Sequence, residues 1–315
     1  MSTPIIVPPP PNGPASRRAV RNVAVRVGCR LAYQIPQDVA AVFKLRPRID
    51  AHQMLEDEFL RFGHDLPYED ADDGRDNRMQ RLLLPAGSVE IRHDAIVSVP
   101  CVLDNHDQAD DLLLSPLHLP AEAVRCTLPS RYCDSDKLLN LAWSTFAGVP
   151  GGHERVRAIC DWVHEHVEYR FGSGRSDIAA SEVVSQGFGV CRDFAHVGIA
   201  LCRAMNIPAR YVTGHLPDIG YVDPGSPMDF HAYMEVYLGG KWFTYDPRYN
   251  VPRIGRVAIA RGLDAVDGAF ATIYGSAQLS YFEVWAYQTP LDAGTVGEPI
   301  DLSRRLDGTE TIRFE

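Results

Sequence analysis

The chain has 315 residues, of which 45% are hydrophobic, so it is long enough for two globular domains with buried cores. Its 31 Lys and Arg residues are outnumbered by 41 Asp and Glu residues, which gives a formal net charge of -10. That charge argues against nucleic acid or an anionic membrane surface as a general partner. No stretch approaches the roughly 18 consecutive apolar residues of a membrane-spanning helix.

The N-terminus and the cysteines indicate a cytoplasmic protein. Residues 1–20 are rich in proline and lack the long apolar core of a secretory signal, so a disordered tail is expected there. The seven cysteines are an odd number, thinly spread and without the spacing of a disulfide framework. Reduced thiols in a cytoplasm fit this pattern best.

Residues 21–120 contain short β-type runs separated by turn residues and acidic loops, which predicts an antiparallel β domain. The loop YEDADDGRDN has a glycine in the place expected for an EF-hand, but the other ligand positions do not match, so a solvated loop is expected rather than a calcium site. DNHDQADD at 104–111 is likewise expected to be a surface loop, and a substrate-facing loop is an equal alternative.

Further along the chain the pattern becomes helical. Apolar residues recur at three- and four-residue steps in HERVRAICDWVHEHVEYRF, which predicts a helix with one apolar face. A run from Cys191 through Phe194, Val197 and Leu201 predicts a second amphipathic helix that ends near Asn206. Cys191 would then lie at a helix N-terminus, where backbone N–H groups and the helix dipole favour a thiolate.

The segment HAYMEVYLGGKWFTYD predicts a β-hairpin with a two-residue turn at 239–240. Leu238 then pairs with Lys241, and the register places Asp246 on the same face as His231, about 7 to 8 Å away along the diagonal. A slip of one residue would turn the carboxylate to the opposite face.

Cys191, His231 and Asp246 together have the chemistry of acyl transfer from an amide: a nucleophile, a base and a carboxylate that orients the base. Each residue taken alone is more often structural, but the helix start and the shared strand face agree, so a catalytic triad is predicted. A zinc site formed by Cys191, His196 and His231 is the competing interpretation. It is disfavoured because His196 lies five positions along the helix, turned away from Cys191. No metal and no cofactor is predicted.

The run GVCRDFAHVGIALCRAMNIPARYVTGHL, followed by DFHAYMEVYLGGKWFTYDP, resembles the core of the bacterial transglutaminase-like superfamily, whose members are often described as proposed cysteine proteases. The Cys-Arg-Asp-Phe-Ala-His run, the Ile-Pro-Ala-Arg-Tyr-Val run, the His-Ala pair and the Asp-Pro pair fall in family order. The resemblance covers roughly residues 130–290 and, more weakly, 20–120. It implies Cys191 as nucleophile, His231 as base and Asp246 as the residue that orients the imidazole.

The same resemblance implies an α+β fold. Residues 121–315 would form a papain-like or transglutaminase-like core with helices packed on an antiparallel sheet, preceded by the β domain of residues 21–120. After Asp246, the runs AFATIYG and LSYFEVWAY are expected to complete the sheet behind the site.

The leading functional hypothesis is hydrolysis of a peptide or isopeptide bond, with a protein or peptide substrate, no nucleic acid and no membrane. A protein-glutamine transglutaminase or deamidase would use the same triad, and a catalytically idle peptide-binding module is a different class that stays open. Animal transglutaminases carry a tryptophan directly after the nucleophile, whereas Arg192 follows here, which weakens the case for cross-linking. The oxyanion that forms on the attacked carbonyl would accept hydrogen bonds from the backbone N–H of Cys191 and from a second donor, for which Gln186 is a candidate.

Overall fold

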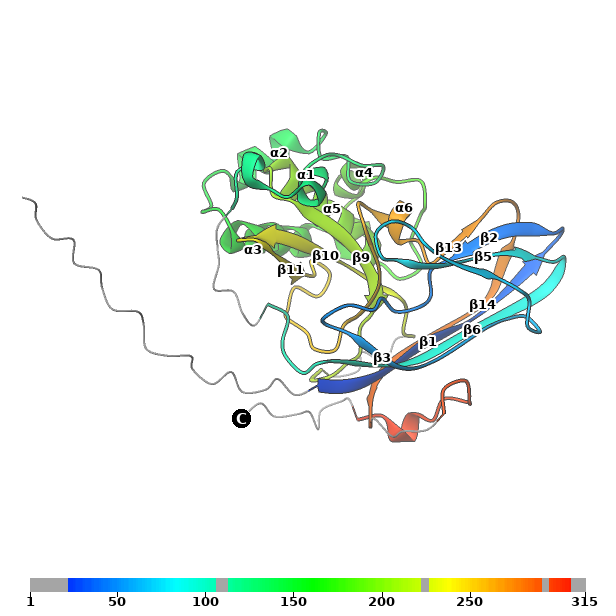
Figure 1. Cartoon of the computed structure of the whole chain (residues 1–315). Helices are drawn as coiled ribbons and strands as arrows, with labels where there is room; N and C mark the ends of the chain where they lie inside the picture. The colour runs from blue at the N-terminus through cyan, green and yellow to red at the C-terminus, as the bar shows by residue number, and fades with distance from the viewer. Residues whose placement is uncertain (1–21, 106–112, 222–226, 291–294, 307–315) are drawn as a thin grey trace, which may run out of the picture.

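The computed structural model describes residues 22–105, 113–221, 227–290 and 295–306. The expected tail at 1–20 and residues 106–111 of the acidic loop lie outside these ranges. Within the described residues, no helix is both long and apolar enough to cross a bilayer. The fold is α+β, as predicted, and combines antiparallel sheets with a group of helices (Figure 1).

Two four-stranded antiparallel sheets contain the N-terminal strands (Figure 1). The first has the order β14-β1-β6-β3, with bounds Gln278–Thr289, Asn22–Ile35, Gly87–Pro100 and Met54–Phe62. The second has the order β13-β2-β5-β4, with bounds Ala271–Ile273, Val39–Phe43, Arg78–Leu84 and Glu69–Asp72. Alternating burial along β2 and β5 reflects the period of two that the sequence shows there.

A third four-stranded antiparallel sheet lies beside the helices and has the order β11-β10-β9-β12. Its bounds are Lys241–Tyr245, His231–Leu238, Ala209–His215 and Val257–Gly262. The helices are α1 Ala121–Arg125, α2 Leu139–Phe146, α3 His153–His166, α4 Ala180–Gln186, α5 Cys191–Ala204 and α6 Ala265–Gly268, with 3₁₀ turns at Pro116–His118 and Leu302–Arg304. A short parallel pair, β7 Glu168–Tyr169 and β8 Phe188–Gly189, leads into α5.

The last strands of the chain join the N-terminal sheets. The prediction that AFATIYG and LSYFEVWAY complete the sheet behind the site is wrong, because β13 pairs with β2 and β14 pairs with β1. The strand that closes the third sheet beside β9 is β12. A β-type pattern indicates that a strand forms, but its partner depends on tertiary packing.

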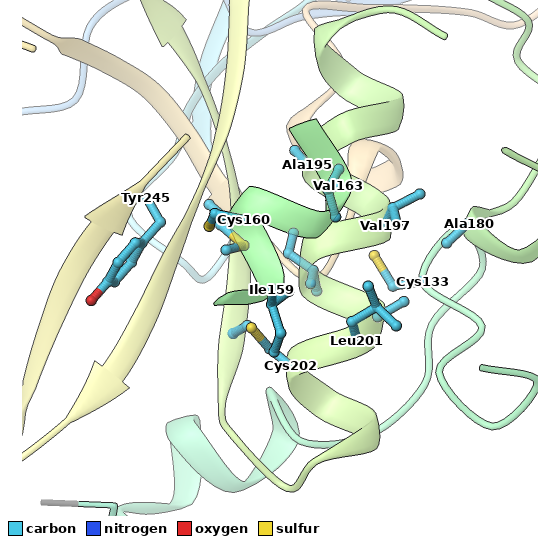
Figure 2. Packing of buried hydrophobic residues seen from close by; sticks show 14 of the residues in the cluster. Cys133, Ile159, Cys160, Val163, Ala180, Ala195, Val197, Leu201, Cys202 and Tyr245 are labelled. Carbon is cyan, nitrogen blue, oxygen red and sulfur yellow. The ribbon is translucent and has the colours of Figure 1, made fainter. Parts of the chain in front are cut away.

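Helix α5 is buried on all sides, although its sequence predicted an amphipathic helix. Every side chain from Asp193 to Ala204 is buried. The helix contacts α2, α3 and α4 on one side and β9 and β10 on the other. Figure 2 shows this packing, with Val197, Leu201 and Cys202 of α5 near Ile159, Cys160 and Val163 of α3. Because α5 is enclosed, the position of its first residue, Cys191, is set by the core.

Gly198 allows α5 to approach the chain just after β11. A Cβ at this position would lie 2.9 Å from Cγ of Pro247 and 3.0 Å from Sδ of Met234, which is closer than side-chain carbons pack. The glycine therefore brings the helix that begins at Cys191 against the turn that follows Asp246.

Substitution Gly198→Val is expected to destabilise the fold by roughly 1–3 kcal/mol, because the added methyl groups overpack this contact. Gly148→Val is the matched control, since nothing lies within 4 Å of a Cβ built there. Urea unfolding of both variants measures the difference. An equal loss of stability in the two would contradict the close-approach argument.

Candidate active site

Cys191 is the first residue of α5, directly after β8, so the predicted helix N-terminus is confirmed. Gly189 is needed two residues earlier, because a Cβ there would lie 2.7 Å from the Cβ of Asp193. The Asp193 carboxylate accepts a hydrogen bond of 2.9 Å from the backbone N–H of Val190, which satisfies an amide at the helix start.

The predicted register of the hairpin is also confirmed. Leu238 pairs with Lys241, and the ladder continues so that Asp246 comes to lie on the face of His231. Nε2 of His231 donates a hydrogen bond of 2.7 Å to Oδ2 of Asp246, and both side chains are buried. An ionised carboxylate can only accept, so Nε2 carries the proton and Nδ1 is the nitrogen that remains to act as a base.

Both oxygens of the Asp246 carboxylate are engaged. Oδ1 accepts hydrogen bonds from the backbone N–H groups of Arg248 and Tyr249, at 3.1 and 3.3 Å. Oδ2 accepts from His231 and also lies 3.0 Å from Nη1 of Arg256. Burial would raise the pKa of this carboxyl, but His231 and Arg256 hold the pKa well below its usual range. The carboxylate is therefore ionised and held in one orientation.

Arg256 is in turn held by Asp104. Its Nε donates a hydrogen bond of 2.8 Å to Oδ2 of Asp104, and the two side chains are only 6% and 14% exposed. The same oxygen accepts from the backbone N–H of Arg253 at 2.9 Å. The prediction of a surface loop at 104–111 is wrong for Asp104, because this carboxylate is buried against a cation.

Cys191 and His231 line one cavity of about 390 Å³. Tyr169 and Arg248 contribute to its wall on the helical side, and residues 283–287 of β14 contribute to its wall on the side of the first sheet. The cavity therefore lies where the two parts of the molecule meet.

The thiol of Cys191 faces the start of β10. Its sulfur donates a long hydrogen bond of 3.8 Å to the carbonyl oxygen of Phe230, the residue before His231. Within the described parts of the chain, no hydrogen bond joins this thiol to the imidazole. The triad hypothesis also predicts that this sulfur lies about 3 to 4 Å from a ring nitrogen of His231, and that contact stays a prediction.

The thiol is harder to ionise than its place at a helix start suggests. Burial raises the pKa of Cys191 to about 12, and the carboxylate of Asp229 adds to the increase. The backbone N–H groups of Ala232 and Arg192 act in the opposite direction and are outweighed. The expected preference for a thiolate is thus overcome by burial, so the resting cysteine is a neutral thiol that needs a base.

The other candidate residues lie outside this cavity. His196 stacks on Tyr132 with 5.2 Å between ring centroids, and its Nε2 accepts a hydrogen bond from the N–H of Ala265, so it is not placed to share a zinc ion with Cys191. Gln186 donates a hydrogen bond of 2.7 Å from its side-chain amide to the carbonyl of Phe188. That contact supports the turn into β8 and leaves the second oxyanion donor unassigned.

Comparison with known proteins agrees with this geometry. A profile of the transglutaminase-like superfamily matches residues 140–247, which include all three triad candidates. A solved structure of a proposed cysteine protease from Cytophaga hutchinsonii superposes with a TM-score of 0.79 at 32% identity, over 87% of this chain and 93% of that one. The chain belongs to the transglutaminase-like superfamily.

Two curated proteins match shorter segments of the chain. An uncharacterised protein of Mycobacterium leprae is 31% identical over 117 residues, which are 36% of this chain and 42% of that protein. The human kyphoscoliosis peptidase is 28% identical over 103 residues, which are 31% of this chain and 16% of the human protein. The chain therefore covers less than half the length of these two relatives.

Three neighbours of the triad candidates were not found from sequence. Arg256 sits in the run RIGRVAIA, where nothing marks it as different from the other arginines. Asp104 belongs to an acidic run that is typical of a solvated loop, and Asp229 precedes His231 without a recognisable pattern. Asp229 could have been suspected only because it lies two residues before His231. Arg256 and Asp104 gave no signal, because their contacts join segments that are far apart in the sequence.

Substitution Asp229→Asn is expected to speed the alkylation of Cys191 by iodoacetamide at pH 8, because removing the carboxylate lowers the pKa of the buried thiol. In the parent protein the rate should rise about tenfold per pH unit above pH 8, since only the thiolate reacts. Peptide mass spectrometry of Cys191 measures both. An unchanged rate in Asp229→Asn, or a rate in the parent that is independent of pH, would contradict this assignment.

Substitution Arg256→Gln is expected to lower kcat by up to about a hundredfold with little change in KM, because Asp246 loses a contact that holds it against His231. Arg261→Gln is the matched control: this partly buried arginine pairs with Asp50 at 2.7 Å and Glu235 at 3.0 Å and does not touch the triad candidates. Equal losses of kcat in the two folded variants would show that Arg256 has a general structural role only.

Proposed function

We propose that the protein is a cysteine hydrolase that cleaves amide bonds in proteins or peptides, with Cys191 as nucleophile, His231 as general base and acid, and Asp246 as the orienting carboxylate. The observation that carries the proposal is the placement of Cys191 and His231 on one cavity, with Nε2 of His231 tied to a buried, ionised Asp246. Similarity to a proposed cysteine protease over most of both chains supports this interpretation.

The first half of the reaction forms a thioester. Nδ1 of His231 accepts the thiol proton as the sulfur of Cys191 attacks the carbonyl carbon of the amide, and a tetrahedral oxyanion forms. When that intermediate collapses, the bond from carbon to nitrogen breaks and the imidazolium gives its proton to the leaving amine. The acyl group is then bound to Cys191 as a thioester, and the amine product leaves.

The second half of the reaction returns the enzyme to its starting state. Nδ1 of His231 takes a proton from water as the oxygen attacks the thioester carbon, and the sulfur leaves with that proton. Asp246 stays ionised throughout and stabilises the imidazolium that forms in both halves. The backbone N–H of Cys191 at the start of α5 is the donor available to the oxyanion.

A neutral resting thiol suits this order of events. Because burial raises the pKa of Cys191, the proton moves only when a substrate carbonyl is in place to receive the sulfur. A substrate also displaces water from the cavity, which strengthens the interaction between the imidazolium and Asp246. The alternatives use the same groups: water as acceptor on a glutamine side-chain amide gives deamidation, and a lysine amine in place of water gives the transglutaminase reaction.

We also propose a reducing compartment such as the cytoplasm. All seven cysteines are free thiols, and five of them are buried. A cysteine nucleophile has to stay reduced for acyl transfer, which a cytoplasmic thiol pool ensures.

A substrate-profiling digest of a peptide library tests the proposed reaction, with cleavage, deamidation and isopeptide formation scored together. The parent protein should produce new peptide termini and Cys191→Ala should produce none. His231→Ala should lose nearly all activity, and Asp246→Ala should keep a measurable residual activity, because Asp246 orients the base without reacting.

Each variant must first match the parent by circular dichroism, since Asp246 also accepts hydrogen bonds from the turn after β11. Full activity of Cys191→Ala on a substrate that the parent cleaves would exclude the proposed nucleophile. Isopeptide products in place of new termini would favour the transglutaminase alternative.

A further inference from the structure

The cavity that contains Cys191 is bounded on one side by the edge of a β-sheet. Five consecutive residues of β14, from Glu283 to Tyr287, line it. Side chains alternate between the two faces of a strand, so a cavity bordered by five residues in a row runs along the strand's edge and not over one face. In the sheet order β14-β1-β6-β3, β14 is the end strand and pairs on one side only.

One hydrogen bond shows which residues of β14 direct their backbone groups away from β1. The carbonyl of Gln288 accepts a hydrogen bond of 2.9 Å from the N–H of Leu306, outside the ladder between β14 and β1. In an antiparallel ladder the N–H and C=O of one residue point to the same side, and the side alternates from residue to residue. The register from Tyr281 to Thr289 has no bulge, so Val284 and Ala286 also point outward, toward the cavity.

Among the described residues, these outward groups are buried and have no hydrogen-bond partner in the protein. Val284 is 6% exposed and Ala286 is 1% exposed. Across the described residues, no hydrogen bond outside the ladder involves the N–H or C=O of either residue. More than 90% of buried backbone groups in folded proteins are paired, and the outward groups of these two residues can be paired only by cavity water or by a ligand. An edge of this kind at a cavity therefore points to a ligand that supplies the missing partners.

The edge is held rigidly beside the nucleophile. Trp285 donates a hydrogen bond of 3.1 Å from its indole nitrogen to Oδ1 of Asp94, which anchors the strand to β6. The carbonyl of Phe230 accepts the hydrogen bond from the thiol of Cys191. The ring of Phe230 packs against Phe282 of β14, with 6.1 Å between ring centroids. A ligand on the edge at Val284 therefore lies next to the start of β10, where the reacting groups meet.

We propose that β14 is a binding site for the main chain of an extended polypeptide substrate, which adds as a further strand to the edge at Val284 and Ala286. This inference rests on the proposed function, because it concerns the acyl substrate of Cys191. The two outward residues are about 7 Å apart and offer two donors and two acceptors, which match residues i and i+2 of an extended chain. A small amide without a polypeptide backbone cannot satisfy these groups. The pairing of Leu306 with Gln288 occupies the next outward position, so the free edge ends there.

Peptidyl electrophiles test the site although the natural substrate is unidentified. An acetylated tetra-alanyl chloromethyl ketone is compared with its singly N-methylated versions and with chloroacetamide, which has no peptide backbone. The rate constant for inactivation is measured at Cys191 by mass spectrometry. When each rate is divided by the same reagent's rate with free glutathione, the peptide ketone should react with Cys191 at least tenfold faster than chloroacetamide. N-methylation of an amide that faces β14 should slow inactivation by the peptide ketone about tenfold. N-methylation of the amides between them should change the rate less than twofold, because only alternate amides of an extended peptide face the strand.

Substitutions of Ala286 provide the matched pair on the protein side. Ala286→Pro removes the outward N–H, and proline is tolerated at an edge strand where that N–H faces away from the sheet. It should slow the peptide ketone about tenfold and leave the rate with chloroacetamide unchanged. Ala286→Gly keeps the N–H and should behave as the parent. If Ala286→Pro fails to fold, the N-methyl series on the parent protein decides the question alone.

The two proposals fail in different ways. Equal rates for all the methylated ketones, or no preference for the peptide ketone over chloroacetamide, would overturn the polypeptide site while leaving the triad intact. If chloroacetamide labels Cys191 equally fast in the parent and in His231→Ala, the proposed catalytic pair fails, whatever the methylated ketones show.

Discussion

The buried carboxylate of Asp246 is the group on which the candidate site depends. Its Oδ2 holds the imidazole of His231 and contacts Arg256, and its Oδ1 is held by the turn that follows β11. A carboxylate with a single neighbour could rotate or take up a proton, whereas this one can do neither. Since Gly198 brings α5 against the adjacent Pro247, the same turn also fixes the helix that begins at Cys191. Cys191 and His231, the candidate nucleophile and base, are thus both positioned by contacts with this one short segment.

The site belongs to both parts of the molecule. The helices and the third sheet provide the triad candidates, while β14 of the first sheet provides the opposite wall of the cavity. Asp104, at the end of the segment that leaves β6, holds Arg256 and so links the first sheet to the carboxylate. The sheets that contain the N-terminal strands therefore provide one wall of the cavity, and the segment that follows β6 supports the contacts of Asp246. An isolated helical part would lack one wall of its own cavity.

Local sequence patterns predicted the local features of the site. The helix start at Cys191 follows from apolar spacing, and the shared face of His231 and Asp246 follows from a two-glycine turn, because both depend on neighbours within a few residues. The errors all concern long-range contacts. The pattern of β14 indicated a strand but not its pairing with β1. The acidic run at Asp104 gave no sign that its carboxylate pairs with a buried arginine. At Cys191, the helix dipole predicted a lowered thiol pKa, whereas burial, which only the fold reveals, raises that pKa.

The tautomer of His231 provides the most direct test of the central claim, that an ionised Asp246 accepts a hydrogen bond from Nε2–H and leaves Nδ1 unprotonated. Nitrogen-15 NMR of the imidazole in the neutral form of the side chain distinguishes the two ring nitrogens. We expect Nε2 to carry the proton, with a hydrogen-bonded proton signal that is lost in Asp246→Ala. A neutral imidazole protonated at Nδ1, or an Nε2 proton unaffected by Asp246→Ala, would contradict this claim.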